Sequence, residues 1–480
     1  MTAATPTMSI GSRHEVRSLR QSLKDYQGGN VFEQVRDQLQ SGEFRVELVD
    51  CQVTQCVDND PITFKGVGIV SQSKDGELEF VLVCQSTEGP YDRYALLNNY
   101  ISGKLIGDDG LYSIKGQDHN GHEWISERQL INRSHGHSLR ISAKLSELKT
   151  ARSVHANKNG KEYCGWYFTG ELMLPFRPHE NDFECELEGW TWKAIKDHHG
   201  NVELRFNSLA PDFEKNSRSF LTGVSLLAGQ SPVPCCSWHI KGDKEEVTIL
   251  PHGLRPQGSR LLEFIPREWI YRGHWNAFLS LWINAKSDAT TRDVQEVLYH
   301  YFHRILKTYQ NDMENSVQVI ASSIEGLIST FYHLDSDIDL EFAAILEDAI
   351  AKISASDLEI DDRALGVLKS SLRNSKLPKL KVSFRRLITD GILTKDMLDA
   401  WDKVRNKAAH GGLLDPTTDA TQTHLDGFFQ CYEAFKRIIF DVIKYAGTHR
   451  DYSLKNWPVI EPPVQSVSES ETEQSVVTQS

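Results

Sequence analysis

Residues 317–331 read VQVIASSIEGLISTF and place apolar side chains at intervals of three and four positions. An α-helix turns once every 3.6 residues, so this spacing gathers the apolar side chains into one stripe. Residues 294–306 repeat the spacing. The two stretches therefore predict two long amphipathic helices, or one bent helix, whose apolar stripes need partners to pack against.

The rest of the C-terminal half supplies those partners. Five further segments carry an apolar stripe at helical spacing and contain no internal proline: 339–355, 361–373, 381–390, 395–409 and 422–446. Pro378, Gly391 and the pair Gly411–Gly412 fall between segments, where helix ends are expected. We therefore predict an all-α bundle over residues 267–450.

The chain before the bundle has a different period. Residues 44–266 contain short β-branched and aromatic runs separated by glycine, asparagine and aspartate, which is typical of strands and turns. Residues 64–71 and 78–84 predict a β-hairpin, and 162–174, 183–196 and 202–209 predict further strands. The prediction is an α+β protein with a β-rich N-terminal domain of sandwich or barrel-like form. Residues 1–43 form a helical or flexible lead, and residues 451–480 form a disordered acidic tail.

Composition limits the classes of function. The 480 residues exceed what one hydrophobic core usually organises, and the net charge of -13 argues against a general basic coat for nucleic acid. The chain has no apolar run of membrane-spanning length and no signal-peptide core, so we expect a cytoplasmic protein without membrane contact. It has no glycine-rich phosphate loop and no CxxC pair, and its histidine pairs, such as His119 with His122, lie in turn-like sequence. We expect no metal and no cofactor.

One motif carries chemistry. Residues 404–412 read VRNKAAHGG, with Arg405 and His410 near the end of a predicted helix. Guanidinium and imidazole suit the binding of a phosphodiester and the transfer of its protons. Spacing alone is weak, because Arg128 with His135 is similarly spaced. The surroundings are more specific, because residues 369–407 hold eleven lysines and arginines against four aspartates, a local charge of +7 that is either an RNA-binding surface or a solvated helical face.

The helix must change its geometry at this motif if both side chains are to act on one group. Five residues at 100° per residue place Arg405 and His410 about 140° apart on a regular helix. They converge only if the last turn loosens, and Gly411–Gly412 makes that change inexpensive. A helix C-terminus also favours the protonated imidazole of His410.

These residues resemble the HEPN family of helical bundles, which carry an Arg-x4 to 6-His motif with a polar residue commonly after the arginine, here Asn406. The resemblance covers about residues 294–445. Residues 323–327, SIEGL, resemble the first bundle helix of the subgroup that includes ApeA anti-phage proteins, and residues 116–124, GQDHNGHEW, are loosely similar to the domain before that bundle.

The resemblance implies a metal-independent endoribonuclease that acts as a homodimer in anti-phage defence by abortive infection, with a phage-derived trigger at the N-terminal domain. Arg405, Asn406 and His410 would be catalytic, and Glu325 would hold a guanidinium if the bundle brings it close. The residues expected to attract RNA are Lys403, Lys407, Arg385 and Arg386. The alternative is a non-catalytic dimerisation or binding module whose β domain senses a ligand, with Arg405 and His410 in a capping role.

Overall fold

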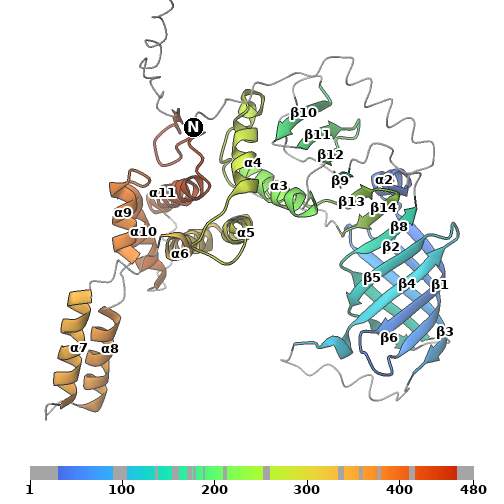
Figure 1. Ribbon diagram of the computed structural model, residues 1–480, viewed down its shortest axis with the longest axis horizontal. Coiled ribbons are helices and arrows are strands. Elements are labelled where there is room, and N and C mark those ends of the chain that lie inside the picture. Colours follow the sequence, from blue (N-terminus) through green and yellow to red (C-terminus); the bar gives the residue numbers. More distant parts are fainter. Residues whose placement is uncertain are drawn as a thin grey trace, which may run out of the picture. The chain divides into compact units, whose positions relative to one another are not determined.

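The computed structural model describes two compact units, residues 1–259 and residues 260–480 (Figure 1). Within them the described residues are 31–89, 105–135, 139–153, 162–169, 174, 176, 180–187, 190–208, 213–251, 260–332, 340–355, 361–375, 380–409 and 417–461. The protein is α+β, with antiparallel strands in the first unit and helices in the second, as predicted. Over the described residues, no helix combines the length and the hydropathy needed to cross a bilayer.

The first unit contains one long antiparallel sheet. It begins with helix α2 (Val31–Ser41) and continues with strands β1 (Arg45–Gln55), β2 (Thr63–Gln72), β3 (Leu78–Glu88), β4 (Tyr112–Asp118), β5 (Glu123–Gln129), β6 (Asn132–His135), β7 (Leu139–Leu145), β8 (Leu148–Ser153), β9 (Glu162–Phe168), β10 (Asp182–Leu187), β11 (Trp190–Lys196), β12 (Val202–Ser208), β13 (Cys236–Lys241) and β14 (Lys244–Ile249), with the short 3-10 helix η2 (Asp108–Gly110) before β4. The spatial order is β10-β11-β12-β9-β13-β14-β8-β5-β4-β1-β2-β3-β7-β6. Side chains from strands far apart in this order share one hydrophobic core, so the sheet curls around that core.

One prediction for this unit is confirmed, and two features differ from the sequence prediction. The predicted hairpin of β2 and β3 is confirmed, with Gln72 opposite Leu78. Residues 183–196, however, contain two strands, β10 and β11, which pair with Leu187 opposite Trp190. Two strands so close in sequence leave the period-2 pattern almost uninterrupted, and the sequence therefore predicted one strand.

Helix α3 (Phe213–Ala228) was not predicted, since it lies inside the strand-rich region. Its apolar residues Phe220, Val224 and Leu227 recur at helical spacing and are buried. Phe220 packs with ring centroids 4.9 Å from both Trp192 and Phe206, which are paired on neighbouring strands. Helix α3 therefore covers the face of the sheet to which these aromatic rings point.

Helix α2 covers the opposite face. Phe32 lies 5.5 Å from Trp238, and Trp238 pairs with Gly165 on β9. A Cβ on Gly165 would lie only 2.5 Å from the indole nitrogen of Trp238, so the glycine provides the space for this ring. Trp124, Trp192 and Trp238 are buried in the core, whereas Trp166 is half-buried.

The second unit is a helical bundle built around α6. Its elements are η3 (Arg267–Arg272), α4 (His274–Asn284), α5 (Val294–Asn311), α6 (Met313–Phe331), α7 (Leu340–Ala355), α8 (Asp362–Ser375), α9 (Leu380–Thr389), α10 (Lys395–Ala409), α11 (Thr418–Val442) and the strands β15 (His449–Arg450) and β16 (Val459–Ile460). Helix α6 contacts α5, α9, α10 and α11, and its stripe is buried from Val317 to Ile328. Residues 317–331, on α6, therefore lie at the centre of this core.

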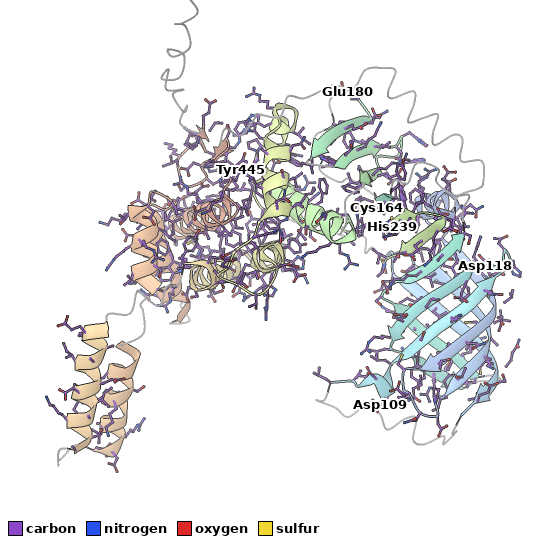
Figure 2. The ribbon with its side chains drawn as sticks, in the orientation of Figure 1. Asp109, Asp118, Cys164, Glu180, His239 and Tyr445 are labelled. Atoms are coloured by element: carbon purple, nitrogen blue, oxygen red, sulfur yellow. The ribbon has the colours of Figure 1, made fainter. Side chains whose placement is uncertain are left out.

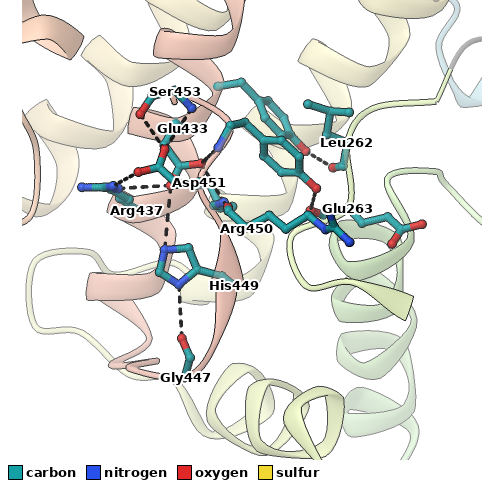
Figure 3. A network of polar contacts seen from close by, with 12 residues as sticks. Leu262, Glu263, Glu433, Arg437, Gly447, His449, Arg450, Asp451 and Ser453 are labelled. Atoms are coloured by element: carbon teal, nitrogen blue, oxygen red, sulfur yellow. Dashed lines mark hydrogen bonds and ion pairs between the residues drawn. The ribbon is translucent and has the colours of Figure 1, made fainter. Parts of the chain in front are cut away.

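The segment after α11 differs from the predicted tail. Residues 451–461 are described, and Asp451 and Tyr452 are buried against α11 (Figure 3). The buried Glu433 accepts hydrogen bonds from Lys436 Nζ at 2.7 Å and from the Tyr452 backbone N–H at 3.0 Å. Arg437 reaches Asp451 at 2.7 Å. The composition of residues 451–461 did not predict this packing, because a few side chains hold the segment in place and no periodic apolar stripe does.

Two tyrosines extend the same network to the start of the unit. The Tyr432 hydroxyl donates to the Leu262 carbonyl at 2.5 Å, and the Tyr452 hydroxyl donates to the Glu263 carbonyl at 2.7 Å (Figure 3). Residues 260–266 thus belong with the helical unit, although the sequence placed them with the strands. The cause is again a long-range contact, since Leu262 and Tyr432 are distant in the chain.

Candidate functional site

The predicted site begins at the C-terminal part of α10, which is held firmly against its neighbours. Trp401 is buried and donates its indole N–H to the Ala321 carbonyl on α6 at 3.2 Å, while its ring lies 5.5 Å from Phe384 on α9. Arg405 follows Trp401 by one helical turn, and its guanidinium carbon lies 5.6 Å from the centre of the Trp401 ring. The buried tryptophan therefore supports the stem of Arg405.

Glu325 and Arg405 form an ion pair between α6 and α10. Arg405 Nε donates to Glu325 Oε1 at 2.6 Å, and the side chains are 52% and 31% exposed for Arg405 and Glu325. A charge-assisted hydrogen bond of this length restricts the guanidinium more than solvent would. The structure thus brings together these two predicted residues, which are 80 positions apart in sequence.

Tyr301 on α5 packs against Gly326, the residue after Glu325, and the sequence did not single it out. A Cβ at position 326 would overlap the Tyr301 ring and hydroxyl, so Gly326 is required for the close approach of α5 to α6. The signal in the sequence was the glycine inside an otherwise strong helix, which is costly unless another group packs there.

The other predicted residues fall into three groups. Asn406 and Lys403 on α10 and Arg385 on α9 are exposed. Arg386 is half-buried and donates to the Tyr332 carbonyl, so its guanidinium is partly engaged inside the protein. Lys407 lies in α10, but its side chain is outside the described part of the structure. His410 lies outside the described residues, which stop at Ala409, the last residue of α10.

Pairing lowers the effective charge of the basic residues 369–407. Lys381 Nζ lies 2.8 Å from Asp402 Oδ2, and Arg405 is paired with Glu325. The exposed cations of α9 and α10 include Arg385 and Lys403. Over the described part of α9 and α10, Lys381 and Arg405 are therefore engaged by carboxylates while Arg385 and Lys403 stay exposed, which suits attraction of a backbone at one place.

Of the histidine pairs in turn-like sequence, His119 with His122 lies between β4 and β5. His122 Nδ1 lies 3.2 Å from Asp118 Oδ2, and the Asp118 carboxylate also accepts from the Trp124 indole at 3.1 Å. This network closes the turn between β4 and β5, and the hydrogen bonds outweigh burial in lowering the Asp118 pKa. Within the described ranges, no three histidine, cysteine, aspartate or glutamate side chains gather as metal ligands.

A second feature of interest is a groove of about 600 Å³ in the first unit. Its floor follows one face of β5, β8, β14, β13 and β9, where the register aligns His239 with Cys164 and with Glu246 (Figure 2). Residues 217 and 218 of α3 form one side. Trp166 lies on the floor, and its indole nitrogen is buried with no hydrogen-bond partner among the described residues.

The rim of this groove is charged but largely neutralised. Lys149 lies 2.6 Å from Glu147, and Lys244 lies 2.5 Å from Glu246. The interior between these pairs is a mixture of aromatic, aliphatic and small polar side chains. A concave site of this size and composition is typical of binding sites for small ligands.

Comparison with protein-family models, with curated proteins and with solved structures finds no match for this chain.

Proposed function

We propose that the protein is a metal-independent endoribonuclease of the HEPN type that acts in anti-phage defence by abortive infection. One observation carries the proposal: the Glu325–Arg405 pair holds a half-exposed guanidinium on the last turns of α10, the helix that leads directly into His410. A capping role for Arg405 gives no reason for an interhelical carboxylate to fix it. A phosphate-binding role does, because a fixed guanidinium loses less freedom on binding.

The chemistry would use the 2'-hydroxyl of the RNA as the nucleophile. Its oxygen attacks the neighbouring phosphorus, the bond from phosphorus to the 5'-oxygen breaks, and a 2',3'-cyclic phosphate forms. A base takes the proton of the 2'-hydroxyl, and an acid gives a proton to the leaving 5'-oxygen. Arg405 would stabilise the added negative charge on the phosphorane, and Asn406 would orient Arg405 or the phosphate.

A second copy of the chain would complete the site. One His410 can serve as base or as acid at a given moment, whereas two copies supply both roles and two guanidinium groups. Lys403 and Arg385, exposed near the motif, would attract the RNA backbone, with Lys407 and Arg386 as further contributors. The β-rich unit would receive a phage-derived trigger and restrain the nuclease in its absence.

The test is RNA cleavage by His410→Ala and Arg405→Ala with folding verified by circular dichroism. We expect both variants to lose cleavage and cellular toxicity, wild-type activity to persist in chelator, and the products to end in 2',3'-cyclic phosphate. Wild-type cleavage and toxicity in both variants would exclude the proposal. A requirement for magnesium would exclude the mechanism.

A second candidate is a non-catalytic protein whose helical unit dimerises and whose β unit binds a ligand. The groove beside α3 favours it, because the site is concave and its rim charges are mutually neutralised. An uncharged aromatic ligand would fit it best. Titration with indole, followed by nuclear magnetic resonance of wild type and Ala151→Trp, distinguishes this candidate: binding that the variant abolishes, together with no cleavage by wild type, would favour it over the nuclease.

A further inference from the structure

Helix α6 is accessible along one side, although its apolar stripe is buried. The accessible positions of its C-terminal half are Ser322, Glu325, Gly326 and Ser329, and we call them the α6 strip. At 100° per residue these positions fall within an arc of about 100°, so they form one continuous line along the helix. All of them except Glu325 are serine or glycine, so the strip presents short side chains and polar groups.

Helices α10 and α5 border the strip on its two sides (Figure 1). Helix α10 reaches it with Arg405, whose Nε lies 2.6 Å from Glu325 Oε1. Helix α5 reaches it with Tyr301, because a Cβ on Gly326 would overlap the tyrosine hydroxyl. Glu325 and Gly326 are consecutive and point about 100° apart, so the guanidinium and the phenol meet α6 at the same height from different sides.

The distance between these two groups has an upper limit. The Tyr301 hydroxyl lies within about 4 Å of the Gly326 Cα, because it would touch a Cβ there. Consecutive Cα atoms are about 3.8 Å apart, and an extended glutamate side chain reaches about 5 Å further. With 2.6 Å from Glu325 to Arg405, the hydroxyl and the guanidinium are at most about 15 Å apart. A strand of a few nucleotides spans this distance, since a nucleic-acid strand carries a phosphate every few ångströms.

The Tyr301 hydroxyl is available to a ligand. Over the described residues it makes no hydrogen bond, and its oxygen is not among the buried atoms that lack a partner, so solvent reaches it. The ring end packs on Gly326, which fixes the hydroxyl beside the strip. A glycine inside a helix weakens that helix, and here it makes room for this ring. A phenol can donate to a phosphate oxygen without carrying a charge of its own.

Arg304 adds a positive charge on the same side of α5. It follows Tyr301 by three residues, so the two side chains are neighbours on the helix, with Arg304 about 60° closer to solvent. Arg304 is exposed, and no carboxylate of the described residues pairs with it. It lies outside residues 369–407, so the count of charge along the sequence did not find it.

We propose that the RNA strand held by Arg405 crosses the α6 strip and is bound on the other side by Tyr301 and Arg304. The Tyr301 hydroxyl donates to an oxygen of a backbone phosphate close to the one at Arg405, and Arg304 attracts the backbone beside it. This path rests on the proposed ribonuclease for its substrate and adds two residues to that site. Both contacts are to the backbone, so they position the RNA without reading its bases.

The first experiment measures binding of a fluorescein-labelled 2'-O-methyl RNA to the full-length chain by fluorescence anisotropy. This RNA lacks the 2'-hydroxyl nucleophile, so binding is measured without cleavage. We expect Tyr301→Phe to raise Kd about 5- to 20-fold, because it loses a hydrogen bond to a charged group while the ring stays on Gly326. Arg304→Ala should raise Kd and lower the slope of log Kd against log salt concentration by about 0.7, whereas Tyr301→Phe should leave that slope unchanged.

Tyr309→Phe is the matched control. Tyr309 lies on the same helix but faces α11, where its ring stacks on Phe428 at 5.1 Å. Its replacement should change Kd less than about twofold, and circular dichroism verifies the fold of each variant. No binding by wild type, a Kd of Tyr301→Phe within about twofold of wild type, or equal weakening by both tyrosine variants would overturn the path.

The same variants separate this path from the nuclease itself. Binding that depends on Tyr301, without cleavage of unmodified RNA by wild type, would exclude the ribonuclease and keep the RNA-binding strip. Cleavage by wild type with no effect of Tyr301→Phe on Kd would keep the ribonuclease and exclude the path.

The second experiment locates the phosphate. A methylphosphonate, which removes the negative charge and one acceptor oxygen, replaces one phosphate at a time in the shortest 2'-O-methyl RNA that binds with full affinity. At one position the replacement should weaken binding by wild type several-fold and add no further loss in Tyr301→Phe, since both changes remove the same contact. Equal penalties in wild type and Tyr301→Phe at every position would overturn the assignment of the hydroxyl to a phosphate.

Discussion

Glu325→Gln separates the positioning of Arg405 from the stability of the bundle. Glutamine keeps the shape and one acceptor but removes the charge that holds the guanidinium at 2.6 Å. Both partners are partly exposed, at 52% and 31%, so the pair contributes only about 0.2–1 kcal/mol to folding. That free energy corresponds to a change in melting temperature of at most about 4 °C for a unit of this size.

The expected effect on cleavage is larger. If Glu325 sets the position of the guanidinium at the phosphate, its loss should lower the single-turnover cleavage rate about 10- to 100-fold, since small displacements of a reacting group cost up to about that factor. The assay is cleavage of a labelled RNA at saturating enzyme, with melting followed by circular dichroism. Arg405→Lys should behave like Arg405→Ala, because an ammonium cannot contact phosphate in the bidentate manner.

The chain supplies a matched control on the same helix. Asp402 on α10 pairs with Lys381 on α9 at 2.8 Å, and the two side chains are 33% and 44% exposed. Asp402→Asn therefore removes an equivalent interhelical pair outside the motif and should lower stability by a similar amount while leaving cleavage unchanged. Equal loss of cleavage in Glu325→Gln and Asp402→Asn, or cleavage by Glu325→Gln within about twofold of wild type, would refute the positioning role.

Three further predictions concern stability. Lys436→Met should lower the free energy of unfolding by about 3–5 kcal/mol in urea titrations, because it removes one partner from the fully buried pair with Glu433. Burial lowers the pKa of His449, so the unfolded chain binds a proton at higher pH; stability should fall as pH drops from about 7 to 5, and His449→Gln should reduce that slope. Gly165→Ala should displace Trp238 and cost about 1–3 kcal/mol, visible in tryptophan fluorescence, and an unchanged spectrum and stability would contradict the packing.

Local periodicity predicted most elements but none of the contacts that make the candidate site. The stripe from Val317 to Ile328 and the extent of α10 could be read directly, because a helix records its buried face at fixed spacing. The sequence could not predict that Glu325 contacts Arg405, because this contact depends on how α6 and α10 pack. It could only say what Glu325 would do if the two residues were close. Spacing also failed for α3, whose period was lost among strands on both sides.

The contacts of Tyr432 and Tyr452 with residues 262 and 263 bear on how the protein is made. Tyr432 and Tyr452 are synthesised 170 and 189 residues after their partners Leu262 and Glu263. At about 5–20 residues per second, the interval between them is roughly 10–40 s. The helical unit therefore cannot complete these contacts until that interval has passed, because Tyr432 and Tyr452 have not yet been synthesised. For a protein proposed to cut RNA, the order of synthesis would itself delay the first active molecule.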